Sequence, residues 1–325
     1  MVPVLEIQNL HVAYSSREGT ELQALAGAGF ALQQGEILGV LGESGSGKST
    51  LAAALVKLLP PSGRITKGAV LFEGQDLLQA NSEELRRVRG ARIATIFQEP
   101  SLALHPTMRV GKQVHQVLAA HSAAGNGALR ELTQETFSML FSGDADRVAK
   151  SYPHQLSGGQ RQRVLIAQAI VCHPSVIIAD EPTASLDPTT QMEILGVFRT
   201  LQRKLALAMI FITHNPALLA GFADRVLVLY GGRVVECGPA EAVLASPQHP
   251  YTRALFKSIP ANLEYGGNAR KTKLPAIPGD ASSLPLEGCS FEPRCTERMD
   301  TCRERRPALV NFAAAHTVSC FRYEK

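Results

Sequence analysis

An apolar run, a glycine-rich loop and a helical pattern follow one another early in the chain, and this succession narrows the folds that the sequence can adopt. The loop is Gly42-Glu43-Ser44-Gly45-Ser46-Gly47-Lys48-Ser49, which fits the pattern G-x-x-x-x-G-K-S/T. The strand-like run 37–41 precedes it, and a helical pattern over 48–59 follows, with Pro60-Pro61-Ser62-Gly63 as its expected end. Backbone N–H groups in such a loop, together with the helix N-terminus, bind phosphate. The sequence therefore predicts a nucleotide-binding α/β fold.

The side chains of this loop suit a nucleoside triphosphate with its Mg²⁺. Lys48 is expected to reach the β- and γ-phosphates, and Ser49 to bind Mg²⁺. A chance Gly/Ser turn is the alternative, but the flanking strand and helix make it remote. The candidate ATP-binding residues of the loop are Gly42, Glu43, Ser44, Gly45, Ser46, Gly47, Lys48, Ser49 and Thr50.

A second apolar run ends in two adjacent carboxylates. The segment 176–179 leads directly into Asp180 and Glu181. Paired acids at the end of a buried strand are costly unless a cation lies nearby. We expect Asp180 to hold Mg²⁺ through water and Glu181 to polarise the attacking water as a general base. Ordinary surface contacts at a strand end are the alternative.

A third segment also has the character of a phosphate-facing helix start. Ser157, Gly158 and Gly159 precede a helical pattern that continues to Cys172. Serine and glycine at a helix start leave backbone N–H groups available to an anion. A single nucleotide need not use both anion-binding surfaces of one chain.

The order of apolar patterns predicts an α/β architecture with two additions. Short runs at 5–12 and 24–32 indicate an N-terminal antiparallel β subdomain, and helical spacing from about 107 to 172 indicates an inserted helical subdomain. Strand, crossover helix and buried strand imply a mainly parallel sheet with flanking helices. The further strands are expected at 69–72, 92–97, 176–179, 209–213, 226–230 and 233–236, and a helix at 189–204.

Composition and charge exclude several other classes of protein. The chain has 45% hydrophobic and 19% charged residues with a formal charge of +4, as is ordinary for a globular protein. No dense Lys/Arg run with interleaved aromatics indicates a nucleic-acid partner. No apolar stretch approaches the roughly 20 residues needed to span a bilayer. The first residues lack the pattern of a secretion signal, so we expect the chain in the cytosol.

Taken together, these motifs resemble the ATPase subunits of ABC transporters, from the N-terminus to about Pro260. The resemblance implies a P-loop NTPase core of ABC type, with Leu156-Ser157-Gly158-Gly159-Gln160 as the signature motif. In this family the signature motif caps the γ-phosphate of ATP held by the partner subunit, so two chains close head to tail over two ATPs. The residues that would face the ATP of the partner subunit are Ser157, Gly158, Gly159, Gln160 and Asp187.

The same resemblance assigns roles to residues outside the loop. Tyr14 would stack on adenine, Gln98 would touch Mg²⁺ and sense the transmembrane partner, and His214 would contact the γ-phosphate. Taken singly, these three could equally be a half-buried strand aromatic, a surface loop residue and a core histidine. The residues that would carry catalysis are Glu181, His214, Lys48 and Gln98.

A narrower resemblance lies in the C-terminal third of the chain. It is carried by Gly238-Pro239, by 249–255, by Ser258-Ile259-Pro260 and by Pro278-Gly279, which are similar to the ATPase subunits of oligopeptide, dipeptide and nickel importers. The expected domains are an ABC ATPase domain at 1–260 and a Cys-rich extension at 261–325.

The resemblance also implies partners and a location. The chain would drive import through two transmembrane permease subunits, beside a second ATPase chain, identical or paralogous, and indirectly with an extracytoplasmic solute-binding protein. It would lie peripherally on the cytoplasmic face of the inner or plasma membrane. An ABC-type ATPase without a permease is the alternative, but this chain has neither the long coiled-coil insertion nor the second fused cassette that such a protein would carry.

Four cysteines crowd the end of the chain, at Cys289, Cys295, Cys302 and Cys320. In a reducing cytosol such a cluster indicates a metal rather than disulfides. In some members of the importer group the same spacing is associated with a 4Fe-4S iron–sulfur cluster. Zn²⁺ is the alternative, although the paired C-x-x-C knuckles of structural zinc are absent. His316 could be a further ligand, but a lone histidine in an apolar segment more often packs or makes a hydrogen bond.

Three positions depart from the family pattern. Asn215 follows His214 where aspartate is usual, His105 replaces asparagine, and the segment 140–150 lacks a Val-Gly-Leu turn. None of them removes a phosphate or metal ligand. These departures therefore concern coupling to the membrane subunits rather than the chemistry of hydrolysis.

Overall fold

The computed structural model describes residues 2–15, 20–258, 276–279, 285 and 287–324. The chain divides into two compact units, each assembled from segments far apart in the sequence. The helical unit comprises residues 1–4, 32–36 and 76–212, and the loop unit comprises residues 5–31, 37–75 and 213–325.

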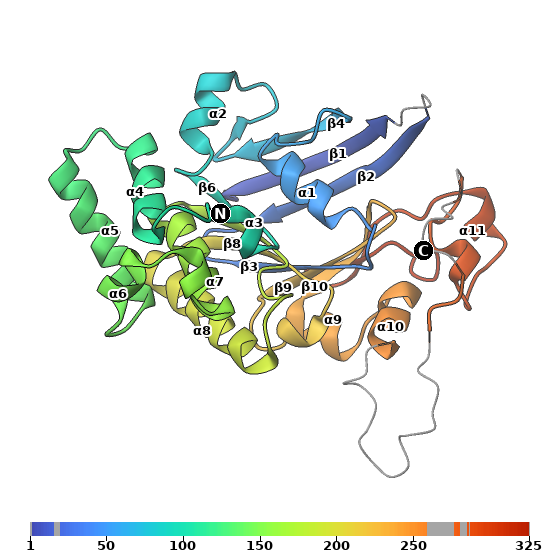
Figure 1. Ribbon diagram of the computed structural model, residues 1–325. Coiled ribbons are helices and arrows are strands. Elements are labelled where there is room, and N and C mark those ends of the chain that lie inside the picture. The colour runs from blue at the N-terminus through green and yellow to red at the C-terminus, as the bar shows by residue number, and fades with distance from the viewer. Residues whose placement is uncertain (1, 16–19, 259–275, 280–284, 286, 325) are drawn as a thin grey trace, which may run out of the picture. The chain divides into compact units, whose positions relative to one another are not determined.

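An antiparallel sheet occupies the N-terminal part of the loop unit (Figure 1). Its strand order is β2-β1-β4-β5, and Leu5 of β1 lies opposite Phe72 of β4. The strands are β1 (Leu5–Ser15), β2 (Glu21–Leu32), β4 (Gly63–Phe72) and β5 (Gln75–Asp76). The antiparallel subdomain expected from the sequence is therefore present.

A second set of strands in the loop unit is ordered β11-β12-β10-β9-β3. β3 and β9 are parallel, and the pairs β9/β10, β10/β12 and β11/β12 are antiparallel. These strands are β3 (Ile37–Leu41), β9 (Arg225–Tyr230), β10 (Arg233–Pro239), β11 (Val310–Ala313) and β12 (His316–Val318). Every residue of β3 is buried, as its unbroken apolar run predicts.

The helices of the loop unit are short. They are α1 (Lys48–Leu55), α9 (Ala240–Ala245), α10 (Pro250–Lys257) and α11 (Thr301–Glu304), with the 3₁₀ turns η2 (Pro216–Leu218) and η5 (Glu292–Arg294).

Three parallel strands form the sheet of the helical unit, in the order β8-β7-β6. They are β6 (Ile93–Ile96), β7 (Val176–Asp180) and β8 (Ala208–Ile212). α4 contacts α5, α6 and α7, so the inserted helical segment forms one cluster (Figure 1). The helices are α2 (Ser82–Val88), α3 (Pro100–Ala103), α4 (Val110–His121), α5 (Asn126–Leu140), α6 (Ala145–Lys150), η1 (Pro153–Gln155), α7 (Gly158–Ile170) and α8 (Pro188–Leu205).

The expected α/β class is confirmed, and the pairing of the strands is mixed because β10, β11 and β12 run antiparallel to their neighbours.

The end expected for the first helix is wrong. α1 ends at Leu55 rather than near residue 59, because Lys57 takes a φ of 53° and reverses the chain before the two prolines. β11 and β12 were not expected, since short strands in a segment rich in Pro and Cys carry no clear periodicity.

Among the helices of the described residues, none combines the length and the apolar character that a bilayer crossing requires.

Candidate functional site

The glycine-rich loop has room only for glycine at two of its positions. A Cβ atom on Gly47, whose φ is 105°, would lie 2.6 Å from the carbonyl oxygen of Ala24. A Cβ atom on Gly42 would lie 2.4 Å from the carbonyl oxygen of Leu229. The loop backbone is therefore pressed between β2 and β9, and this packing fixes the position from which α1 begins.

Two side chains of the loop point to phosphate as its ligand. Lys48 is buried, and its Nζ atom donates to the carbonyl oxygens of Gly42 at 2.8 Å and Glu43 at 2.9 Å. The hydroxyl of Ser46 is also buried and meets no hydrogen-bond partner among the described residues. A buried hydroxyl without a partner costs about 1–3 kcal/mol. An anion seated on the loop would satisfy it.

Tyr14 lies beside the same helix start. Its hydroxyl is 3.3 Å from Oγ1 of Thr50, and its ring is so close to Gly63 that a Cβ atom there would lie 2.7 Å away. The ring is half-buried on β1. The structure thus brings together Tyr14 and Thr50, two of the expected ATP-binding residues.

Asp180 is the last residue of β7 in the helical unit, and Glu181 follows it directly. Glu181 has a φ of 46°, a left-handed conformation that is uncommon for a residue other than glycine, and its N–H donates to the carbonyl oxygen of Ile212 at 3.0 Å. Such a conformation costs on the order of 1–3 kcal/mol and is concentrated at functional sites. Nε2 of Gln98 donates to the Glu181 carboxylate at 3.4 Å. The structure therefore brings Gln98 and Glu181 together, which the sequence did not predict as a contact.

The Ser-Gly-Gly segment is a capped helix start. The Ser157 hydroxyl accepts from the N–H of Gln160 at 3.2 Å, and the Gln160 side chain accepts from the N–H of Ser157 at 3.1 Å. This reciprocal pair is a capping box, and it leaves the Ser157 residue exposed. A Cβ atom on Gly159 would lie 2.7 Å from the methyl group of Thr190. Glycine at this position therefore lets α7 and α8 start side by side.

Asp187 caps the neighbouring helix α8. Its carboxylate accepts from the N–H of Thr190 at 3.0 Å and from the Thr190 hydroxyl at 2.7 Å, and these hydrogen bonds lower the pKa of Asp187. Gly158 is also close to this end of α8, because its Cβ atom would lie 3.3 Å from Leu186. Five residues expected to face a partner subunit, Ser157, Gly158, Gly159, Gln160 and Asp187, thus lie at two adjacent helix starts.

His214 is exposed two residues after the end of β8 in the chain, and Asn215 next to it is a turn cap. The side-chain oxygen of Asn215 accepts from the N–H of Ala217 at 3.0 Å, at the start of η2. An aspartate oxygen would do the same. The departure at Asn215 therefore leaves the local backbone around His214 intact.

His105 in the helical unit is held by its backbone rather than by its ring. Its N–H donates to the side chain of Gln113 at 2.9 Å, and its carbonyl accepts from the same side chain at 3.0 Å. The imidazole is exposed and lies 3.3 Å from the Thr107 hydroxyl. The substitution therefore changes what this loop presents at the surface and not how it folds.

The four C-terminal cysteines, Cys289, Cys295, Cys302 and Cys320, line one small cavity together with Phe291 and His249. All four are free thiols. Burial, together with the neighbouring cysteines, raises the pKa of Cys289 and that of Cys295 to about 11. Four such thiols in one cavity are the donor set of an iron–sulfur or zinc site. Within the described residues, however, no group of three or more His, Cys, Asp or Glu side chains is arranged to hold a metal ion.

His316 has the hydrogen-bonding role rather than the ligand role. It is buried, and its Nε2 atom lies 2.9 Å from the Glu236 carboxylate. The same carboxylate accepts from the N–H of Gln248 at 2.7 Å and from that of His249 at 2.9 Å. Glu236 thereby joins β10, the start of α10 and β12.

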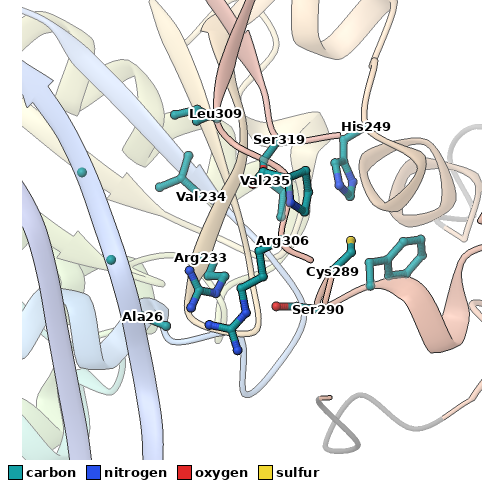
Figure 2. Close-up of a pocket in the computed structure, with 14 residues that line it drawn as sticks. Ala26, Arg233, Val234, Val235, His249, Cys289, Ser290, Arg306, Leu309 and Ser319 are labelled. Atoms are coloured by element: carbon teal, nitrogen blue, oxygen red, sulfur yellow. The ribbon is translucent and has the colours of Figure 1, made fainter. Parts of the chain in front are cut away.

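A larger cavity of about 210 Å³ lies beside the cysteines (Figure 2). Cys289 and His249 lie at one end of it, and Arg233 and Arg306 lie together at the other. Burial and the charge of Arg306 lower the pKa of Arg233. Cys289 and Ala26 of β2 lie on opposite sides of the cavity.

Sequence reasoning missed the residues that contact the glycine-rich loop from the end of the chain. Arg294 forms an ion pair with Glu43 at 2.8 Å, and the hydroxyl of Tyr251 accepts from the N–H of Glu43 at 2.8 Å. Tyr251 lies within the segment 249–255 that carried the narrower resemblance, and Arg294 directly precedes Cys295. No local pattern in the sequence indicates that they meet the loop.

Two family models match the sequence. Residues 25–184 match the model described as ABC transporter, and residues 235–302 match that described as oligopeptide/dipeptide transporter, C-terminal region. The dipeptide transport ATP-binding protein DppD of Bacillus subtilis is 42% identical over 99% of this chain and 95% of its own length. The oligopeptide transport ATP-binding protein OppD of Escherichia coli is 40% identical over 98% of this chain and 93% of its own length.

Solved structures of similar proteins agree with the fold. The dimeric bacterial ABC transporter cassette MJ0796 is 28% identical, with a TM-score of 0.64 over 73% of this chain and 98% of that one. The same cassette is similar to an equal degree in a dimeric post-hydrolysis state bound to ADP and Pi. The cbiO1 protein of Clostridium perfringens is 28% identical, with a TM-score of 0.66 over 76% of this chain and 92% of its own.

Proposed function

The chain belongs to the ATP-binding subunits of ABC transporters, in the group named for oligopeptide and dipeptide transport, and from this membership we propose that it energises import of peptides through separate permease subunits. A related solute such as nickel is the alternative cargo. The single observation that carries this proposal is the similarity to peptide-transport ATPases along nearly the whole chain, including the match over residues 235–302. The chain is an ABC ATPase, so ATP hydrolysis is the source of the energy.

The proposed chemistry is charge neutralisation and orientation of water, which phosphoryl transfer needs more than covalent catalysis. Lys48 would neutralise the β- and γ-phosphates, and Tyr14 would stack on adenine. Glu181 would polarise the attacking water, with Gln98 holding its carboxylate. His214, exposed at a strand end, would contact the γ-phosphate.

Ser49, Gln98 and Asp180 would hold the Mg²⁺ that accompanies ATP. Hydroxyl, amide and carboxylate oxygens are the ligands that this ion prefers, so the residues fit it. When bound, Mg²⁺ would offset the negative charge that develops on the phosphate oxygens.

A second ATPase chain, a paralogue or a copy of this one, would complete the site. Ser157 and Asp187 cap adjacent helix starts, and the positive end of α7 beside the exposed Ser157 suits the phosphate of ATP bound to that second chain. The dimeric state of a similar cassette supports this arrangement. Replacing Ser157 should then impair hydrolysis at the partner's site, and mixing with a Lys48 variant should restore one competent site.

The permease would dock on the helical unit. A groove of about 270 Å³ there is lined by Phe97, Ala103, Val117 and Leu165 among others. Phe97 is 57% exposed and Leu102 on α3 is 82% exposed, which is unusual for large apolar side chains and typical of an interaction surface. The groove is lined by Phe97, which directly precedes Gln98 in the chain. Docking of a permease segment in the groove would therefore shift Gln98. The chain would thus lie on the cytoplasmic face of the membrane, with a solute-binding protein acting from the other side.

The cysteine cavity would hold a 4Fe-4S cluster, or alternatively zinc. Four thiols in one cavity supply the ligands, and the raised thiol pKa values reflect a burial cost that a cation would reverse. The sulfur atoms would have to move to reach ligand geometry. Anaerobic purification followed by iron, sulfide and zinc analysis tests this: about four irons per chain would indicate the cluster, and one zinc without sulfide the alternative.

Uptake measurements test the transport function. A strain that lacks this chain and requires an amino acid should fail to grow on a peptide containing it, and the wild-type chain should restore growth while Lys48→Ala should not. Parallel uptake of radioactive nickel tests the alternative cargo. Peptide uptake that is unchanged without the chain would contradict the proposal.

A further inference from the structure

Glu43, the second residue of the glycine-rich loop, is held at each of its polar groups. Its carbonyl oxygen accepts from Nζ of Lys48 at 2.9 Å, and its N–H donates to the Tyr251 hydroxyl at 2.8 Å. Its carboxylate accepts a two-pronged contact from Arg294, Nη1 at 2.8 Å and Nη2 at 3.2 Å. Two of these three contacts come from residues more than 200 positions later in the sequence.

Arg294 is itself fixed in place. Its side chain is only 4% exposed, whereas the side chain of Glu43 is 24% exposed. Nε donates to the carbonyl oxygen of Pro278 at 2.8 Å, and Nη1 also donates to the Tyr230 hydroxyl at 3.3 Å. A guanidinium with this many fixed acceptors has little freedom, so it presents one geometry to the Glu43 carboxylate.

Aromatic packing joins the turn that carries Arg294 to the core of the loop unit. Phe291, just before η5, lies edge-on to Tyr230 with ring centroids 5.2 Å apart, and to Tyr251 at 5.4 Å. Tyr230 and Tyr251 lie 4.5 Å apart. Burial raises the pKa of Tyr251, so its hydroxyl stays protonated at neutral pH. The three rings hold η5 against the end of β9 and the start of α10.

We propose that Arg294 is a positioning residue for ATP, by which the cysteine-bearing extension braces the glycine-rich loop and sets its affinity for nucleotide. This inference rests on the proposed role of the loop as the ATP site. Arg294 acts through Glu43 and need not touch the nucleotide. Because Cys295 follows Arg294 directly, anything that orders the cysteine segment also orders the brace.

Two physical effects follow from the pair. The two-pronged contact fixes the first turn of the loop, and a preordered loop binds phosphate without an ordering cost. Arg294 also neutralises a carboxylate that would otherwise repel a triphosphate at close range. Both effects act on binding of ATP rather than on its cleavage. Loss of Arg294 should therefore raise the KM for ATP and leave kcat at saturating ATP nearly unchanged.

The test uses the full chain and the non-hydrolysable analogue AMP-PNP with Mg²⁺. Calorimetric titration should give a Kd about tenfold higher for Arg294→Met than for the wild type, and about threefold higher for Arg294→Lys, which keeps the charge but loses the fork. Arg305→Met is the matched control, because Arg305 pairs with Glu324 at 3.4 Å within the same extension and does not contact the loop. Its Kd should equal that of the wild type.

Glu43→Gln closes a double-mutant cycle. In that background Arg294→Met should cost clearly less affinity than in the wild type, and strictly additive effects would overturn the proposal. So would an Arg294→Met chain that is folded by near-ultraviolet circular dichroism and binds within twofold of the wild type. If Arg294→Met does not fold, Arg294→Lys decides: weaker binding with unchanged kcat supports the brace, and unchanged binding overturns it.

Lys48→Ala distinguishes the brace from the site on which it rests. If the Lys48→Ala variant binds AMP-PNP as tightly as the wild type does, the ATP site itself is contradicted. If Lys48→Ala abolishes AMP-PNP binding and Arg294→Met leaves it unchanged, only the proposed role of Arg294 is contradicted.

Discussion

The glycine-rich loop and the cysteine-bearing extension lie in the same compact unit and are built on opposite principles. The chemical groups of the loop come from its own eight residues, between a flanking strand and helix, and glycine is required where β2 and β9 press on it. The extension has short elements and depends on distant partners, such as Glu236 for His316 and Glu43 for Arg294, the latter pair 251 residues apart. A site formed by adjacent residues can therefore be predicted from a sequence, whereas its support by distant residues cannot.

Removal of the Lys48 ammonium group should have the largest effect, and should act on the loop alone. Lys48→Ala should weaken Mg²⁺-ATP binding by about a hundredfold, because a charge-assisted contact to phosphate is lost in a water-poor loop. Thermal unfolding should change much less than binding, because the hydrogen bonds that Lys48 donates stay within the loop, to Gly42 and Glu43. Equilibrium binding and calorimetric melting of the same samples measure both.

The Glu236 carboxylate tests the opposite case, a residue whose removal should act on the extension. Glu236→Gln should lower the free energy of unfolding by about 2–4 kcal/mol, because a fully buried carboxylate with three hydrogen-bond donors loses its charge. Urea unfolding measures this. Glu21→Gln is the matched control: Glu21 pairs with Arg64 on the surface, and its loss should cost less than about 1 kcal/mol. Equal losses for the two variants would contradict the buried network.

The pH dependence of stability should be traceable to His249. Burial lowers the pKa of this histidine from 6.5 to about 3, so the folded chain holds it neutral. Its contribution to stability is then complete above pH 6.5 and is lost as the pH falls toward 3. Between pH 7 and pH 5 the wild type should lose about 2 kcal/mol through this group.

His249→Asn provides the comparison for that measurement. Nδ1 of His249 accepts from the N–H of Tyr251 at 3.0 Å at the start of α10, and an asparagine oxygen can take over this cap. Urea unfolding of the variant should therefore change less between pH 7 and pH 5 than unfolding of the wild type. Parallel curves for the two proteins would exclude His249 as the source.

The smallest effect is expected at Asn215. Asn215→Asp restores the residue usual in the family, yet both side chains offer the oxygen that caps η2. The free energy of unfolding should change by less than about 0.5 kcal/mol, and the rate of ATP hydrolysis should change little. A large gain in hydrolysis would show that a negative charge beside His214 matters in itself.

Local signals in the sequence predicted much of the candidate site. The loop at 42–49, the strand before it, the acids at the end of β7 and the Ser157 cap each follow from residues adjacent in the chain. The contact between Gln98 and Glu181 was not predictable, because it joins two strand ends 83 residues apart. The early end of α1 was not predictable, because the residue in the left-handed conformation is Lys57 and not a glycine, which would have indicated a helix end.

The support of the loop by the C-terminal segments escaped prediction for a similar reason. Tyr251 and Arg294 carry no sequence pattern linked to Glu43, and only the folded arrangement of β9, α10 and η5 brings them together. The same holds for β11 and β12, which are too short to show a periodic pattern and form because β12 pairs with the edge of β10 and β11 pairs with β12.

Hydrolysis by the Glu181→Gln variant tests the central claim most directly. The chain is assembled with its permease and partner ATPase, and ATP binding and steady-state turnover are measured on the same preparation. The variant should bind ATP as the wild type does and turn it over at least about a hundredfold more slowly, because only the water-polarising carboxylate is lost. Turnover at the wild-type rate would contradict the assignment of Glu181, and with it the proposed catalytic site.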